Sequence, residues 1–150
     1  MPVVADVHGW VASGPSYQPL NPSRILDTRD GTGGYGQPIG PGGSIDFTVE
    51  GVGGVPASGV RAVVLSLSVT GGTSAGYLTV WPSGEARPAT SNINFAANQD
   101  TANLVVAKVG AAGRVSIYNP QGSTNVIADV AGWVPTGDVR VTEASWPEGL

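Results

Sequence analysis

The stretch Val63-Val-Leu-Ser-Leu-Ser-Val-Thr70 places apolar side chains at every second position, with small polar residues at most of the positions between. Successive side chains of a β-strand point to opposite faces, so this alternation is typical of a strand with one buried face. No helical period of 3.6 residues fits it. The stretch therefore predicts a strand of an antiparallel sheet whose inner face packs on a core.

The rest of the chain repeats this pattern in short segments, which are separated by many of its 23 glycines and 12 prolines. Val, Ile and Thr together number 38, against 13 for Leu, Met, Lys and Glu, which excludes a helical bundle. Regularly spaced short strands predict an all-β domain, an antiparallel β-sandwich. The further strands are expected at 24–26, 44–50, 77–81, 92–95, 104–109, 114–118 and 126–130.

A weak internal repeat leaves a second architecture open. Tyr77-Leu-Thr-Val-Trp-Pro-Ser-Gly84 is similar to Arg114-Val-Ser-Ile-Tyr-Asn-Pro-Gln-Gly122, and Tyr17-Gln-Pro-Leu-Asn-Pro-Ser23 reads as an eroded third copy. Three copies would suit a pseudo-threefold β-prism or β-trefoil. Because the copies are unequally spaced, the sandwich is the first prediction and the threefold fold the alternative.

A stronger repeat marks the domain boundary. Val4-Ala-Asp-Val-His-Gly-Trp-Val11 returns 123 residues later as Ile127-Ala-Asp-Val-Ala-Gly-Trp-Val134. An offset of domain length predicts a single domain over 12–134, preceded at 1–11 by a strand inherited from a preceding repeat and followed at 135–150 by a linker or tail. The alternative is that both copies pair as first and last strands of one domain.

Composition narrows the function. Cys 0 and His 1 exclude disulfides, a cysteine nucleophile and the usual zinc sites, so no metal and no cofactor is expected. A net charge of -4 with a single lysine gives no basic surface for nucleic acid, and no apolar run is long enough for membrane insertion. His8 corresponds to Ala131 in the repeat, and no G-x-S-x-G motif is present, so the chain is not expected to be an enzyme.

Several distinctive motifs follow one another along nearly the whole chain. They include Tyr17-x-Pro-Leu-x-Pro-x-Arg-Ile-Leu-Asp-Thr-Arg29-x-Gly31, Gly54-Val-Pro-Ala-Ser-Gly59, Gly76-Tyr-Leu-Thr-Val80, Arg87-Pro88, Ser91-Asn-Ile-Asn-Phe95 and Ala128-Asp-Val-Ala-Gly-Trp133. Over nearly the whole chain this succession resembles a tandem-repeat β domain of secreted actinobacterial proteins, often appended to hydrolases or cell-surface chains. The resemblance implies an extracellular accessory role, secreted or attached to the cell surface, and carries over no ligand and no catalytic residue.

The densest polar stretch lies around Asp27 and Asp30. Their carboxylates, Thr32 and nearby carbonyls are the oxygen ligands that calcium prefers, although the EF-hand spacing is absent. The favoured interpretation is structural. We expect an ion pair of Asp27 with Arg29 or Arg24 at a strand end, followed by an Asp30-Gly31 turn.

Exposed aromatic rings are the candidates for ligand contact, because the CH faces of sugars stack on them. The ligand-binding set comprises Trp81, Tyr118, Tyr77 and Tyr35, in which Trp81 and Tyr118 hold equivalent places in the weak repeat and form the predicted stacking platform. The alternative is that these two rings cap the open ends of the core. Trp133, with its counterpart in the first repeat copy, is expected to anchor the domain boundary.

These observations predict a non-catalytic extracellular binding module that attaches a larger protein to a polysaccharide or cell-surface glycan. Its expected partners are that glycan and neighbouring copies of the same domain. The alternative, from a different class, is a purely structural spacer or fibre subunit in which tandem copies supply reach and stiffness without any ligand.

Overall fold

The computed structural model describes residues 2–3 and 16–137. The predicted N-terminal strand at 1–11, apart from Pro2 and Val3, lies outside the described residues, as does most of the predicted tail at 135–150. Within the described ranges, no helix combines the length and the hydrophobicity that a membrane span needs.

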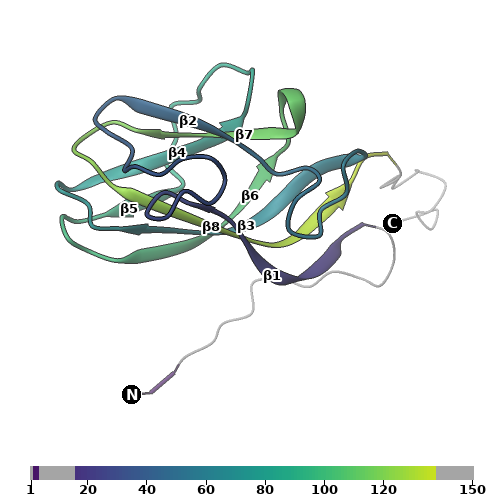
Figure 1. Ribbon diagram of the computed structural model, residues 1–150, viewed down its shortest axis with the longest axis horizontal. Coiled ribbons are helices and arrows are strands. Elements are labelled where there is room, and N and C mark those ends of the chain that lie inside the picture. The colour runs from purple at the N-terminus through teal and green to yellow at the C-terminus, as the bar shows by residue number, and fades with distance from the viewer. Residues whose placement is uncertain (1, 4–15, 138–150) are drawn as a thin grey trace, which may run out of the picture.

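The chain forms two four-stranded antiparallel sheets, which confirms the β-sandwich (Figure 1). One sheet has the order β1-β8-β3-β6 and the other β2-β7-β4-β5, so the threefold alternative is wrong. A 3-10 turn, Ala111–Gly113, precedes β7. The strands are β1 Gln18–Asp27, β2 Gly43–Thr48, β3 Val60–Thr70, β4 Gly76–Pro82, β5 Ile93–Phe95, β6 Thr101–Lys108, β7 Arg114–Asn119 and β8 Asn125–Pro135.

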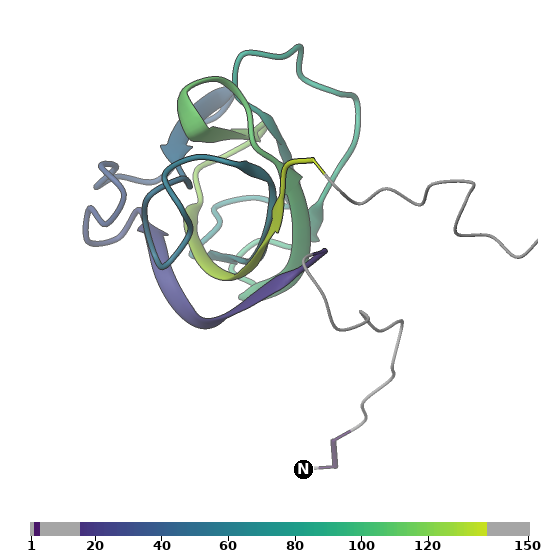
Figure 2. The ribbon, with the colours of Figure 1, turned by 90° about the vertical axis from the view of Figure 1, so that its right-hand side faces the viewer.

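The core lies between the sheets and is built from the alternating residues that the sequence pattern indicated. Leu65 and Leu67 of β3 face it with no exposed surface, and so do Leu78 of β4 and Ile117 of β7. Seen from one end, the strands of both sheets surround this core (Figure 2). Truncating one of these leucines to alanine typically lowers the free energy of unfolding by about 2–5 kcal/mol. The alternating apolar residues therefore stabilise the packing of the two sheets.

The β1–β8 pair explains part of the second repeat motif. The Tyr17 hydroxyl donates to Ala131 O at 3.4 Å, and the Tyr17 ring lies so close to Gly132 that a Cβ there would approach the hydroxyl to 2.2 Å. A larger residue at this position would therefore displace the Tyr17 ring. Trp133 is half-buried and packs against the core, so it belongs to this domain. Strand β8 continues to Pro135, one residue beyond the predicted domain end.

Candidate functional site

The outer face of the β2-β7-β4-β5 sheet carries the candidate site. Tyr118 of β7 lies opposite Thr79 of β4, and both alternate with core residues, so their side chains point away from the core. The loop 83–92 connects β4 to β5 and, in Figure 2, stands out in teal from the sandwich. Thr79 Oγ1 donates to Thr90 O at 2.6 Å, and Val80 N donates to Asn92 Oδ1 at 2.8 Å. These two bonds fasten the end of the loop against β4.

Loop and sheet together form a hollow of about 440 Å³, which we call the tyrosine hollow. Its walls combine two aromatic rings, three hydroxyl side chains and one guanidinium, with no carboxylate among the described lining residues. Tyr77 is 36% exposed, and Tyr118 is half-buried. The lining residues are Tyr77, Thr79, Arg87, Pro88, Ala89, Thr90, Ser91 and Tyr118.

Arg87 is the charged group of the tyrosine hollow. Its guanidinium carbon lies 3.6 Å from the centre of the Tyr118 ring, over the ring face, which is a cation–π contact. The N–H donors of a stacked guanidinium remain directed outward in its own plane. Arg87 lines the hollow and makes no ion pair within residues 16–137, so its guanidinium has no carboxylate partner from this part of the chain.

Trp81 does not line the tyrosine hollow. It lies on the same outer face as Tyr118, opposite Ser116, but its Nε1 donates to Glu85 O at 3.0 Å and its side chain is half-buried. The ring thus supports the start of the loop 83–92. The aromatic pair that faces the hollow is Tyr77 with Tyr118, instead of the predicted platform of Trp81 with Tyr118.

Tyr35 lies elsewhere, at the outer edge of β2. Its hydroxyl donates to Asp46 O at 2.8 Å and accepts from Asp46 N at 3.3 Å, while its ring packs against the core. Both backbone groups of Asp46 are satisfied by one side chain. Of the four predicted ligand-binding residues, the structure therefore brings Tyr77 and Tyr118 together and places Trp81 and Tyr35 in supporting contacts.

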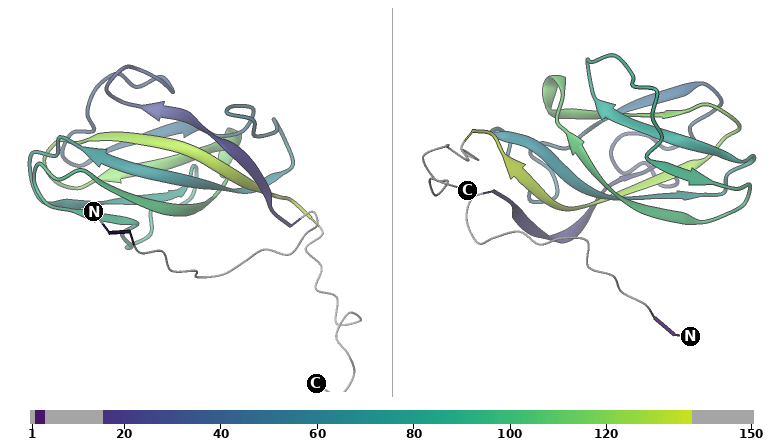
Figure 3. Two further views of the ribbon diagram at one scale, coloured as in Figure 1. Left: turned by 90° about the horizontal axis from the view of Figure 1, so that it is seen from below. Right: turned by 180° about the vertical axis from the view of Figure 1, so that it is seen from behind.

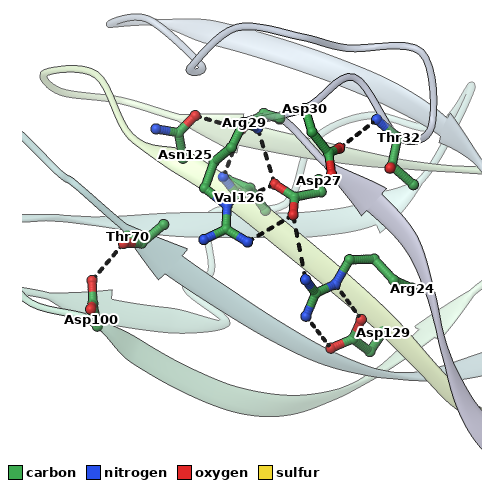
Figure 4. Close-up of polar contacts among 11 residues, drawn as sticks. Arg24, Asp27, Arg29, Asp30, Thr32, Thr70, Asp100, Asn125, Val126 and Asp129 are labelled. Atoms are coloured by element: carbon green, nitrogen blue, oxygen red, sulfur yellow. Dashed lines mark hydrogen bonds and ion pairs between the residues drawn. The ribbon is translucent and has the colours of Figure 1, made fainter.

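The polar stretch at the end of β1 closes on itself (Figure 4). Asp27 is 1% exposed, and its carboxylate accepts from Arg29 Nε at 2.9 Å, from Arg29 Nη2 at 2.8 Å and from Arg24 Nη1 at 3.5 Å. These bonds, those of Arg29 first, lower the pKa of Asp27 from 3.8 to about 2, against the opposing effect of burial. The predicted ion pair is confirmed.

The turn that follows also matches its prediction. Gly31 N donates to Asp27 O at 3.0 Å, Gly31 has a φ of 89° that favours glycine, and Asp30 Oδ1 accepts from Thr32 N at 2.9 Å. Over 16–137, no three Asp, Glu, His or Cys side chains come close enough to hold a metal ion. The local chain thus uses these carboxylates for its own structure.

Models of known protein families gave no match to this chain, and no curated protein matched it either. The candidate site therefore depends on its geometry alone. The sequence pattern missed Arg87 as a site residue, although Arg87-Pro88 stood out as a motif. Its role emerges only from the fold, because the contact with Tyr118 joins residues 31 positions apart.

Proposed function

We propose that the domain is a non-catalytic, extracellular binding module that holds a larger protein to a polysaccharide or cell-surface glycan through the tyrosine hollow. The observation that carries the proposal is the convergence of Tyr77, Tyr118 and Arg87 on one concave, solvent-open surface. Aromatic rings and fixed polar donors are the combination that sugars require, since a sugar ring has apolar CH faces and a polar rim.

Each wall of the hollow has its own part in this proposal. The exposed Tyr77 ring offers a stacking surface, whereas one face of Tyr118 is already covered by Arg87. Thr90 and Ser91 supply hydroxyls at the rim. The outward donors of Arg87 match a carboxylate, because a guanidinium binds carboxylates through two parallel hydrogen bonds. The chemistry therefore favours a glycan that contains acidic sugars over a neutral one.

The lining residues also favour binding over hydrolysis. Glycoside hydrolysis ordinarily uses two carboxyl groups that flank the scissile bond. None of the described residues that line the tyrosine hollow is Asp, Glu or His. A module with such a site retains its ligand unchanged, which suits an accessory role beside another domain.

Affinity electrophoresis in gels that contain soluble polysaccharides tests the proposal. The panel pairs a polyuronate with neutral glucans, and the expected result is retardation of the unmodified chain, strongest in the polyuronate gel. Arg87→Gln should remove most of the preference for the polyuronate. Arg61→Gln is the matched control. It changes the net charge by the same amount, and Arg61 is an exposed residue of β3 in the other sheet.

Two results would contradict the proposal. Equal migration in every gel of the panel would favour the alternative, a structural spacer without a ligand. Equal loss of retardation in Arg87→Gln and Arg61→Gln would show that net charge, and not the tyrosine hollow, causes the retention.

A further inference from the structure

Strand β6 is the one place in the described part of the chain where a long sheet edge is left open. It pairs with β3 on one side and has no strand partner on the other within residues 16–137 (Figure 3, left). Directly after β6, Val109 N donates to Arg61 O at 2.9 Å. Antiparallel ladders alternate, so the odd-numbered residues of β6 bond to β3. The even-numbered residues therefore direct their N–H and C=O groups toward the open edge.

The side chains of those even-numbered residues are apolar and exposed. Leu104 is 63% exposed and Val106 is 67% exposed, and Ala102 beside them is exposed as well. They are the outward-facing residues of β6, opposite Ser66, Val64 and Ser68 of β3. No charged residue and no proline interrupts the strand from Thr101 to Ala107. Such an edge is a template for another strand.

The other three sheet edges are protected. Strand β1 contains Pro19 and Pro22, which lack the N–H that a further strand would need. The edge of β2 is occupied at Asp46 by the Tyr35 hydroxyl. Strand β5 has only three residues. Short edges, prolines and covered edges are the usual means of preventing an edge strand from pairing with another chain. Among the described residues, strand β6 has none of these features, so it is the edge where such pairing is expected.

The sequence of β6 is complementary to itself. When two copies of β6 run antiparallel with Leu104 opposite Leu104, Ala102 lies opposite Val106 and Asp100 lies opposite Lys108. Thr70 Oγ1 donates to Asp100 Oδ1 at 2.6 Å, which places Asp100 in line with the outward-facing residues of β6. All these pairs join even-numbered residues, whose backbone groups face the open edge. The register thus satisfies the hydrogen bonds, the apolar contacts and the charges together.

We propose that a second copy of this chain docks at β6, so that two β6 strands pair antiparallel about a twofold axis and join two sheets into one. Such an interface uses the same strand twice and closes on itself, giving a dimer and not a fibre. The residues that line the tyrosine hollow belong to the other sheet and to the loop 83–92, so the proposal does not depend on glycan binding.

Sedimentation of the full chain over a range of concentrations, beside a variant that introduces a charge into β6, tests this dimer. Leu104→Lys puts two like charges directly opposite each other at the twofold axis and should weaken association by at least tenfold. Since Leu104 is largely exposed, the variant should keep the melting temperature of the monomer. The matched control is Thr48→Lys, an exposed residue of β2 in the other sheet, which should leave the dimer intact.

Cross-linking of the unmodified chain gives a second measurement. Lys108 is the single lysine, and within one copy it lies about 26 Å along the strand from Asp100, too far for a carbodiimide amide bond. A Lys108–Asp100 bond between an isotope-labelled and an unlabelled copy is the expected product. A chain that stays monomeric at all concentrations, or a dimer that Leu104→Lys leaves unchanged, would overturn the proposal. A dimer that forms only after residues 1–15 are removed would do the same, since the chain's own segment would then cover β6.

Discussion

The end of β1 and the tyrosine hollow are both rich in polar side chains, but they differ in where those side chains find partners. Around Asp27, Arg24 and Arg29 both pair with the carboxylate, which is almost wholly buried. Around Tyr118, the guanidinium of Arg87 and the neighbouring hydroxyls face a solvent-open hollow. A closed set of partners stabilises the fold, whereas an open set is available to a ligand.

Replacing Asp27 should give the largest effect on stability. Asp27→Ala removes the buried acceptor of four hydrogen bonds from Arg24 and Arg29 and leaves Arg29 N without its partner, so the free energy of unfolding should fall by about 3 kcal/mol. Urea denaturation measures this change. Glycan retention should be unaffected, and a variant as stable as the parent would show that the ion pair is dispensable.

Acid should weaken the same pair. The pKa of Asp27 is lowered from 3.8 to about 2 in the folded chain, so its contribution is fully present well above pH 3.8 and is lost as the pH falls through about 2. The loss should reach about 2 kcal/mol of unfolding free energy. Denaturation curves from pH 6 to pH 2 test this, with Asp27→Asn as the control that should lack this part of the pH dependence.

In the tyrosine hollow, substitutions should change binding more than stability. Arg87→Gln should weaken retention on a polyuronate by about 1.5 kcal/mol, roughly tenfold, because one charge-assisted pair is lost. Thermal melting should stay close to that of the parent, since Arg87 is exposed. A large drop in the melting temperature would instead assign Arg87 to the support of the loop 83–92.

Tyr77→Ala should have a smaller effect of the same kind. Loss of the exposed ring should weaken retention on both acidic and neutral glycans by about 1 kcal/mol, with little change in stability. Trp81→Phe is the matched aromatic control outside the hollow and should leave retention unchanged. If Trp81→Phe weakened retention more than Tyr77→Ala did, the platform first predicted from the sequence would replace the Tyr77 and Tyr118 pair.

Removing divalent cations should have the smallest effect. Because Asp27 is occupied by Arg29 and Asp30 by the backbone of Thr32, we expect neither a chelator nor added calcium to shift the melting temperature. A ligand that binds only the folded state raises that temperature by mass action. A reversible drop in chelator would therefore make this loop a calcium site.

Much of the fold follows from the sequence because strand alternation is a local signal. The segments around Leu65 and Ile117 were predicted as strands from their own neighbours, and the structure confirms them. The Asp27 ion pair was also predictable, since its arginine partners lie two and three residues away. In each case the interacting residues are close in sequence.

The tyrosine hollow was only half predictable, for the opposite reason. Tyr118 stood out as a rare aromatic residue, but its contact with Arg87 depends on how the loop 83–92 folds back over the sheet. Likewise, the alternation in β4 predicted that Trp81 lies on the outer face, but it could not predict that the Trp81 N–H donates a hydrogen bond to Glu85 O. The alternation determines on which face of the sheet a side chain lies, whereas the fold of the loops determines whether that side chain remains exposed to solvent.

The four tyrosines allow the central claim to be tested in one experiment. In a chain labelled with ¹³C only in its tyrosine rings, Tyr77 and Tyr118 report on the hollow, while Tyr17 packs on Gly132 and Tyr35 on the edge of β2. Titration with a soluble uronic-acid oligosaccharide should shift the ring signals of Tyr77 and Tyr118 and leave those of Tyr17 and Tyr35 in place. Signals that stay unmoved throughout, or shifts confined to Tyr17 and Tyr35, would contradict a glycan site in the tyrosine hollow.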